Sequence, residues 1–185
     1  MNLSARQFQP EGQIVEDVRN ATRAAGIDPK HLMLEITESV LMHDREAIVR
    51  DLDALRALGV RIAIDDFGTG YSALSYLREF PIDTVKMDRS FVHNLGNDAA
   101  DSALVRSVVE LGEALDMQII AEGIEVQGQL DSVTGLRCDI GQGYFFAPPL
   151  DVDSMRTLLS GGEATPPHKL PGDADRARGE ATTST

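Results

Sequence analysis

The amino-acid sequence predicts an α/β fold whose parallel strands are arranged as a (β/α) barrel. Short apolar runs alternate with segments of helical periodicity, and each run ends in polar residues, in three cases close to a glycine. Strand–helix alternation at this spacing gives right-handed βαβ units and a parallel sheet. The chain has 185 residues, of which 42% are hydrophobic, so it is long enough for one domain with a sizeable core.

Six short apolar runs are the predicted strands. They are near-continuous runs of apolar residues, such as Ile62-Ala63-Ile64. This pattern is typical of strands that are covered on both faces. Their ranges are 1–4, 32–36, 61–65, 84–87, 118–121 and 137–140.

Amphipathic helices are predicted between these strands. Gly26 ends the first helix, Gly59 ends the second, and Asn97-Asp98 caps the start of the third. Their apolar stripes are, in order, Ile14, Val18, Ala21 and Ala25; Ile48, Leu52 and Leu55; and Leu104, Val108, Leu111 and Leu115.

The composition changes near residue 161. From there to Thr185 the text is rich in Gly, Pro and small polar residues, with nothing periodic to bury. We therefore expect one domain over 1–160 and a disordered tail over 161–185.

Charge and cysteine content exclude several classes of protein. The net charge of −13 and the pI near 4.6 argue against bulk binding to a DNA or RNA polymer or to an anionic membrane. No apolar run approaches the ~20 residues of a membrane span, and the first residues do not resemble a signal peptide. The single cysteine, Cys138, excludes an internal disulfide and a cysteine-rich zinc site. These features predict a cytoplasmic protein.

Polar residues stand at the carboxyl end of every predicted strand. In a (β/α) barrel these ends converge on one face, whereas an open doubly wound sheet concentrates its chemistry at one switch point. Six contributing strands favour the barrel. The residues are Asn2, Glu35, Asp65, Asp66, Lys86, Asp88, Glu122, Glu125 and Gln142.

A cluster of so many carboxylates implies a bound cation. Two carboxylates ~5 Å apart at an effective dielectric of ~20 repel by roughly 3 kcal/mol, so the cluster either raises several pKa values or holds a cation. Oxygen ligands without cysteine or nearby histidine suit Mg²⁺ or Mn²⁺, and a pair of such ions commonly serves displacement at phosphate. Lys86 adds one positive charge that can position a hydroxide or a phosphate oxygen.

At these positions the sequence resembles the EAL-domain family of bacterial cyclic di-GMP phosphodiesterases. Each match is weak alone, but together they follow the family's order over essentially all of 1–150. The matching segments are Asn2-Leu3-Ser4, Glu35-Ile36-Thr37-Glu38, Asp65-Asp66-Phe67-Gly68-Thr69-Gly70-Tyr71-Ser72, Lys86-Met87-Asp88-Arg89-Ser90-Phe91-Val92, Ala121-Glu122-Gly123-Ile124-Glu125 and Gln142-Gly143-Tyr144.

The resemblance implies a (β/α)₈ TIM-type barrel that hydrolyses one phosphodiester of cyclic di-GMP to the linear dinucleotide with Mg²⁺ or Mn²⁺, two ions in all. It implies metal ligands at Asn2, Glu35, Asp65 and Asp66, and catalytic residues at Lys86, Asp88, Glu122 and Gln142. Glu38 and the loop after Asp65, with Gly68 and Gly70, are similar to the family's segment that links metal binding to dimer contacts, and Glu125 supports the site. A homodimer is therefore a further expectation.

The chain departs from the family pattern at its start. The combination that belongs on the first strand, Glu-Ala-Leu followed shortly by an arginine, does not occur, and about six of the eight βα units are present. An alternative is therefore a non-catalytic EAL module that binds cyclic di-GMP or a protein partner. A third alternative is another barrel enzyme, such as an enolase-like lyase that uses carboxylates and a lysine.

Overall fold

The computed structural model describes residues 1–8, 13–42, 44–68, 77–93, 95 and 99–161. These residues belong to two compact units, Met1–Phe145 and a second that begins at Phe146. The second unit contains helix α7 (Val152–Leu159), which Asp151 caps by accepting a hydrogen bond from the Ser154 amide at 2.8 Å. The domain limit at residue 160 stays a prediction, and the expected tail beyond Gly161 lies outside the described residues.

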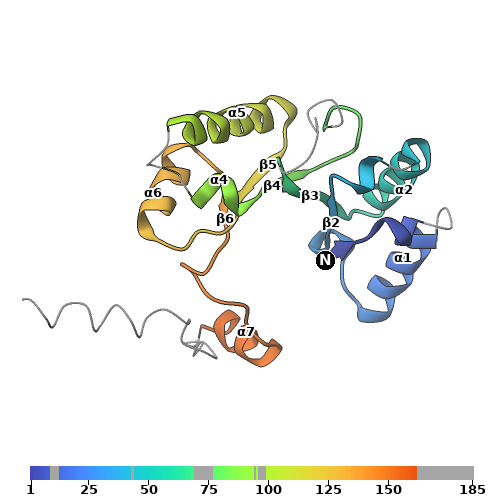
Figure 1. Cartoon of the computed structure of the whole chain (residues 1–185). Helices are drawn as coiled ribbons and strands as arrows, with labels where there is room; N and C mark the ends of the chain where they lie inside the picture. Colours follow the sequence, from blue (N-terminus) through green and yellow to red (C-terminus); the bar gives the residue numbers. More distant parts are fainter. Residues whose placement is uncertain (9–12, 43, 69–76, 94, 96–98, 162–185) are drawn as a thin grey trace, which may run out of the picture. The chain divides into compact units, whose positions relative to one another are not determined.

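The first unit is built on a six-stranded parallel sheet (Figure 1). The strands lie in the order in which they occur in the chain, and each pairs with the next. They are β1 (Asn2–Leu3), β2 (Met33–Thr37), β3 (Arg61–Phe67), β4 (Thr84–Met87), β5 (Gln118–Ala121) and β6 (Ile140–Gly141).

This strand order confirms the barrel arrangement. A doubly wound sheet reverses its strand order at a switch point, and none of the described strands does so. A closed barrel of this kind has eight strands, so the six described here form part of one, with β1 and β6 at its two edges.

Side-chain alternation gives the sheet two different faces. Leu34, Ile64, Met87 and Ile119 point toward the helices, and each is almost completely buried. The intervening positions face the barrel interior, where polar groups appear; strand β4 supplies Thr84 and Lys86, both buried. The apolar face forms the core, and the interior face leads to the site.

Helices surround the row of strands within this unit (Figure 1). Asp44 caps α2, where its carboxylate accepts a hydrogen bond from the Ala47 amide. Gly26 and Gly59 adopt positive φ after the first two helices, as the sequence predicts. The helices are α1 (Gln13–Ala25), α2 (Arg45–Ala57), α4 (Arg89–His93), α5 (Ala99–Leu115) and α6 (Gln127–Gly135), with short 3-10 turns η1 (Ala5–Phe8), η2 (Pro29–His31) and η3 (Val40–Met42).

Three details of the predicted elements are wrong. The last strand begins at Ile140 rather than at residue 137, because the turn that ends α6 continues through Arg137, which has a φ of +64°, and Cys138. On α1 the predicted Ala21 and Ala25 are exposed, and Thr22 is buried instead. On α5 the predicted Leu104 is 51% exposed and Val105 is buried in its place, whereas the other three predicted residues pack against the core as expected. The predicted cap at Asn97-Asp98 lies outside the described residues.

Aspartates fasten the amino ends of the strands in pairs. Asp83, just before β4, accepts a hydrogen bond from the Ile62 amide of β3 at 2.8 Å. Asp139, just before β6, accepts one from the Ile119 amide of β5 at 2.7 Å. Each bond supplies a partner for an amide at the start of a strand, so both hold neighbouring strands at the end opposite the site.

We expect Asp139→Ala to lower the free energy of unfolding by about 1–2 kcal/mol, because the Ile119 amide loses its charged acceptor. Urea denaturation followed by circular dichroism measures this change. Asp131→Ala is the matched control. The Asp131 carboxylate accepts only from the exposed side chain of Gln127, which lies four residues earlier in α6. Equal stability of the two variants would contradict the role given to Asp139.

Whereas Asp139 stabilises the fold, the Thr84 hydroxyl destabilises it. Among the residues that the structure describes, its hydroxyl oxygen is the buried side-chain polar atom that lacks a hydrogen-bond partner. We expect Thr84→Val to raise the free energy of unfolding by about 1 kcal/mol, since the cost of the unsatisfied hydroxyl disappears. Thr22→Val is the control, because the buried Thr22 hydroxyl donates to the Val18 carbonyl; it gains nothing in the same denaturation assay.

Candidate active site

The site is organised around the ammonium group of Lys86. Lys86 Nζ lies 3.0 Å from Glu35 Oε2, 2.7 Å from Asp65 Oδ1 and 2.7 Å from Glu122 Oε1. The lysine is only 5% exposed. These four side chains come from β2, β3, β4 and the residue after β5, so one cation joins four consecutive strands at their carboxyl ends.

The strand register explains why these side chains meet. In β3 and β4, Asp65 and Lys86 stand two residues beyond Ala63 and Thr84, which are partners in the sheet. Positions two apart in a strand share a face, so both side chains point to the barrel interior. Glu35 lies on the same face, since it pairs with Ala63. The sequence prediction that these residues converge is confirmed.

Burial and ion pairing shift the pKa values in the cluster. Burial alone would lower the pKa of Lys86, but the hydrogen bonds from its ammonium to Asp65, Glu122 and Glu35 outweigh burial and raise that pKa well above its usual range. Burial raises the pKa of Glu122, and the charges of Asp65 and Glu35 add to this while Lys86 opposes it. Lys86 therefore remains charged, whereas Glu122 is the carboxyl that accepts a proton more readily.

Asp65 and Asp66 reach the same site although they are adjacent in a strand. The pairing of β3 with β4 shifts between Ile64 and Phe67, where β3 contains one residue more than β4. Asp66 itself has a φ of +52°, in the left-handed region. This bulge turns the Asp66 carboxylate toward the site instead of the opposite face.

A group of three carboxylates fits a divalent cation. Asp65, Asp66 and Glu122 each offer one oxygen, and these oxygens lie within 4.8 Å of one another. All donors are carboxylate oxygens, which Mg²⁺ and Mn²⁺ prefer. The donor set therefore fits the expected metal.

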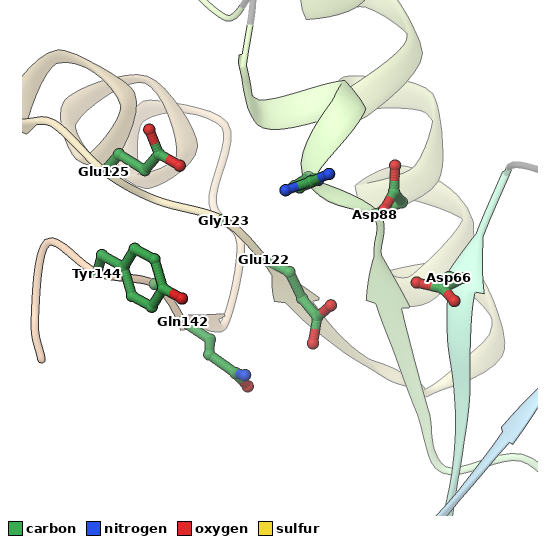
Figure 2. A pocket seen from close by; sticks show the side chains of 9 residues that line it. Asp66, Asp88, Glu122, Gly123, Glu125, Gln142 and Tyr144 are labelled. Carbon is green, nitrogen blue, oxygen red and sulfur yellow. The ribbon is translucent and has the colours of Figure 1, made fainter. Parts of the chain in front are cut away.

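A cavity of about 320 Å³ opens beside this cluster. Figure 2 shows Asp66, Asp88 and Glu122 on one side of it, with Gln142, Glu125 and Tyr144 around the rest. A hydrogen bond from the Ser90 side chain lowers the pKa of Asp88, and the Ser90 amide, which donates to the Asp88 carboxylate at 3.0 Å, lowers it further. The structure thus places four predicted residues beyond the Lys86 cluster on a single cavity: Asp66, Asp88, Glu125 and Gln142.

Three of the remaining predicted residues, Glu38, Gly68 and Asn2, lie on or just after strands β1 to β3. Glu38 Oε1 accepts a hydrogen bond from the Gly68 amide at 2.8 Å, which ties the end of β2 to the loop after β3. Gly68 has a φ of +96° and lies against the Phe91 ring, so a side chain there would be strained and would collide. Asn2 pairs with Glu35 in the sheet and shares its face. Gly70 lies outside the described residues.

The sequence prediction missed several residues that line the cavity: Arg89, Gly123, Gly143 and Tyr144. Gly143 lies so close to the Ile124 backbone that a β-carbon could not fit, and Gly123 approaches Arg89 in the same way. Glycines directly after Glu122 and Gln142 were the available signal, since a glycine beside a predicted site residue often marks a close backbone approach.

Comparison with known proteins identifies the same fold. The sequence model of the EAL domain matches residues 1–149. The chain is 43% identical over 155 residues to the bifunctional diguanylate cyclase/cyclic di-GMP phosphodiesterase MucR of Pseudomonas aeruginosa, covering 84% of this chain and 22% of MucR. It is 38% identical to the cyclic di-GMP phosphodiesterase NbdA of the same organism, covering 79% of this chain and 21% of NbdA. The chain thus spans about a fifth of the length of these relatives.

Solved structures agree with this comparison. The MucR phosphodiesterase in complex with c-di-GMP has a TM-score of 0.77 at 43% identity, covering 83% of this chain and 62% of that one. A manganese/c-di-GMP complex of BlrP1 from Klebsiella pneumoniae has a TM-score of 0.76 at 32% identity, covering 80% of this chain and 38% of that one. In the part of the chain that the structure describes, no helix is long and apolar enough to cross a membrane.

We expect Lys86→Met to lower the free energy of unfolding at pH 7.5 by about 3–5 kcal/mol in EDTA, since three carboxylates lose their shared cation. Burial raises the pKa of Glu122 and Lys86 opposes this rise, so without Lys86 that pKa rises further and the loss shrinks as the pH falls toward 5. In the unmodified protein the raised pKa of Lys86 keeps its contribution complete below about pH 10.

Urea denaturation at several pH values measures this effect. Lys30→Met is the control, because the exposed Lys30 pairs only with the exposed Asp28. A Lys86→Met variant whose loss of stability does not change with pH would contradict the account of the cluster.

Proposed function

The chain belongs to the EAL domain family, and on that premise we propose that it is a metal-dependent phosphodiesterase that hydrolyses cyclic di-GMP to the linear dinucleotide. The observation that carries the proposal is the Lys86 cluster beside three oxygen donors, at the carboxyl ends of consecutive strands. This is the face on which barrel enzymes build their active sites.

The proposed metal ligands are Asn2, Glu35, Asp65 and Asp66. Asp65 and Asp66, whose oxygens converge, would hold two ions, Mg²⁺ or Mn²⁺, together with the other two ligands. Bound divalent ions stabilise the attacking and leaving oxygens of a displacement at phosphorus. The BlrP1 complex supports the choice of metal, since that related structure was solved with both manganese and c-di-GMP.

The other site residues would handle the attacking water and its proton. The Lys86 ammonium is held rigidly by three carboxylates and can orient that water or a phosphate oxygen. Glu122, whose pKa burial raises, can accept the water proton, with Asp88 and Gln142 on the cavity wall. The water oxygen bonds to phosphorus, one ester bond breaks, and the leaving sugar oxygen takes up a proton.

A second candidate function is binding without turnover. It is favoured by β1 and β6, which have no further strand beyond them among the described residues, so that the site stands on part of a barrel rim. In this case the module binds cyclic di-GMP or a protein partner. The enolase-like alternative loses its basis with the family assignment.

The same proposal includes the setting of the protein. The single cysteine supports the cytoplasm as its compartment. A homodimer is proposed through the segment that Glu38 and Gly68 join, by similarity to the family.

We expect the purified chain to convert cyclic di-GMP to the linear dinucleotide with Mg²⁺ or Mn²⁺, and EDTA to abolish the reaction. Asp65→Asn should lower kcat at least about a hundredfold, since it weakens both the metal site and the Lys86 ion pair. Chromatographic separation of substrate and product measures both effects.

Asp53→Asn is the control, because Asp53 is exposed on α2, away from the site. Absence of product with either ion would exclude the enzyme as proposed. Calorimetry then separates the alternatives, since cyclic di-GMP binding without hydrolysis favours the binding module and no binding rejects both.

A further inference from the structure

The segment Glu122–Val126 links β5 to α6 and forms one wall of the cavity. It carries Glu122, which belongs to the Lys86 cluster, and Glu125, which lies on the cavity wall (Figure 2). The segment has no regular secondary structure, so its shape depends on individual hydrogen bonds.

The first half of this segment is held by the sheet. The Glu122 amide donates to the Met87 carbonyl at 3.2 Å, and Lys86 fixes its carboxylate. Ile124 is fully buried, and its amide donates to the Gln142 carbonyl at 3.1 Å. These contacts lie within β4, β5 and the residues after β6, and none involves α6.

The second half of the segment is held by α6. The Val126 carbonyl accepts from the Gln129 and Leu130 amides, and among the described residues Gln129 supplies the side-chain contact to the Glu125 and Val126 amides. Gln129 Oε1 accepts hydrogen bonds from the Glu125 amide at 2.7 Å and from the Val126 amide at 3.1 Å. The side chain is 7% exposed, in the first turn of α6. A glutamine at this place ordinarily reaches back to the N-cap amide, which here is Val126. The bond to Glu125 goes one residue further, into the cavity wall.

We propose that Gln129 is a positioning residue that fixes Glu125 in the cavity and thereby sets the affinity for the ligand. The proposal rests on the proposed function for its ligand, cyclic di-GMP. Gln129 itself does not line the cavity, so it acts through the backbone of Glu125. A carboxylate on a flexible segment binds weakly, because the segment must become ordered when the ligand binds. The entropy lost in this ordering reduces the affinity.

The anchoring of the two halves predicts which kinetic parameter changes. Glu122 keeps its sheet and lysine contacts when Gln129 is removed, so the chemical step is preserved. Glu125 loses its anchor, so substrate binding weakens. Loss of Gln129 should therefore raise KM and leave kcat nearly unchanged, whereas general damage to the fold lowers kcat as well.

Three variants test this. We expect Gln129→Ala to raise KM for cyclic di-GMP about tenfold with kcat within about twofold, since the cost of ordering the freed Glu125 then falls on the binding step. Gln129→Glu retains the acceptor oxygen and should restore KM to within about threefold. Gln127→Ala is the matched control in the same helical turn, because Gln127 bonds only to Asp131 on the surface. Equal effects on KM and kcat, or no effect on KM, would overturn the proposal.

Amide hydrogen exchange provides a readout that needs no activity. In Gln129→Ala the Glu125 and Val126 amides should exchange at least about tenfold faster, while the α6 amides from Leu130 onward keep their protection. Unchanged exchange at Glu125, or a loss of protection throughout α6, would refute the positioning role. If the unmodified chain neither binds nor hydrolyses cyclic di-GMP, the proposed function fails, and the exchange result still decides the role of Gln129.

Discussion

The site depends on one buried cation that is shared among carboxylates from neighbouring strands. Asp65, Glu122 and Glu35 would repel one another at this spacing, and the Lys86 ammonium offsets that repulsion at distances of 2.7–3.0 Å. The lysine can occupy its position only if β2, β3, β4 and β5 are in register. The Lys86 cluster therefore forms correctly only when the strands of the sheet are correctly paired.

Much of the fold could be predicted from the sequence because apolar runs and helical stripes report burial directly. The strands at 84–87 and 118–121 were predicted with the limits that the structure has. The start of β6 could not be predicted, because Arg137 and Cys138 belong to a turn whose hydrogen bonds run back to α6. Leu104 was wrongly predicted to be buried, because Ala103, Leu104 and Val105 are all apolar and fit two helical stripes equally well. Only packing against the sheet determines that Val105 is the buried residue.

The sequence predicted which side chains come together better than it predicted how they are arranged. A charged residue directly after an apolar run is a strong signal, and Glu35, Asp65 and Glu122 all carry it. The bulge at Asp66 carries no such signal, because its cause is the pairing with β4 and a positive φ. Gln129 was missed for a similar reason: it lies on a helix, and its contribution appears only when its two backbone partners are known.

The aspartate side chains at the amino ends each join one pair of strands. Asp83 joins β3 to β4 and Asp139 joins β5 to β6, whereas among the described residues β4 and β5 are joined there by backbone bonds, including that from the Gln118 amide to the Asp83 carbonyl. A chain break or a circular permutation placed between β4 and β5 keeps each aspartate carboxylate with its donor amide, whereas one placed inside either pair separates them.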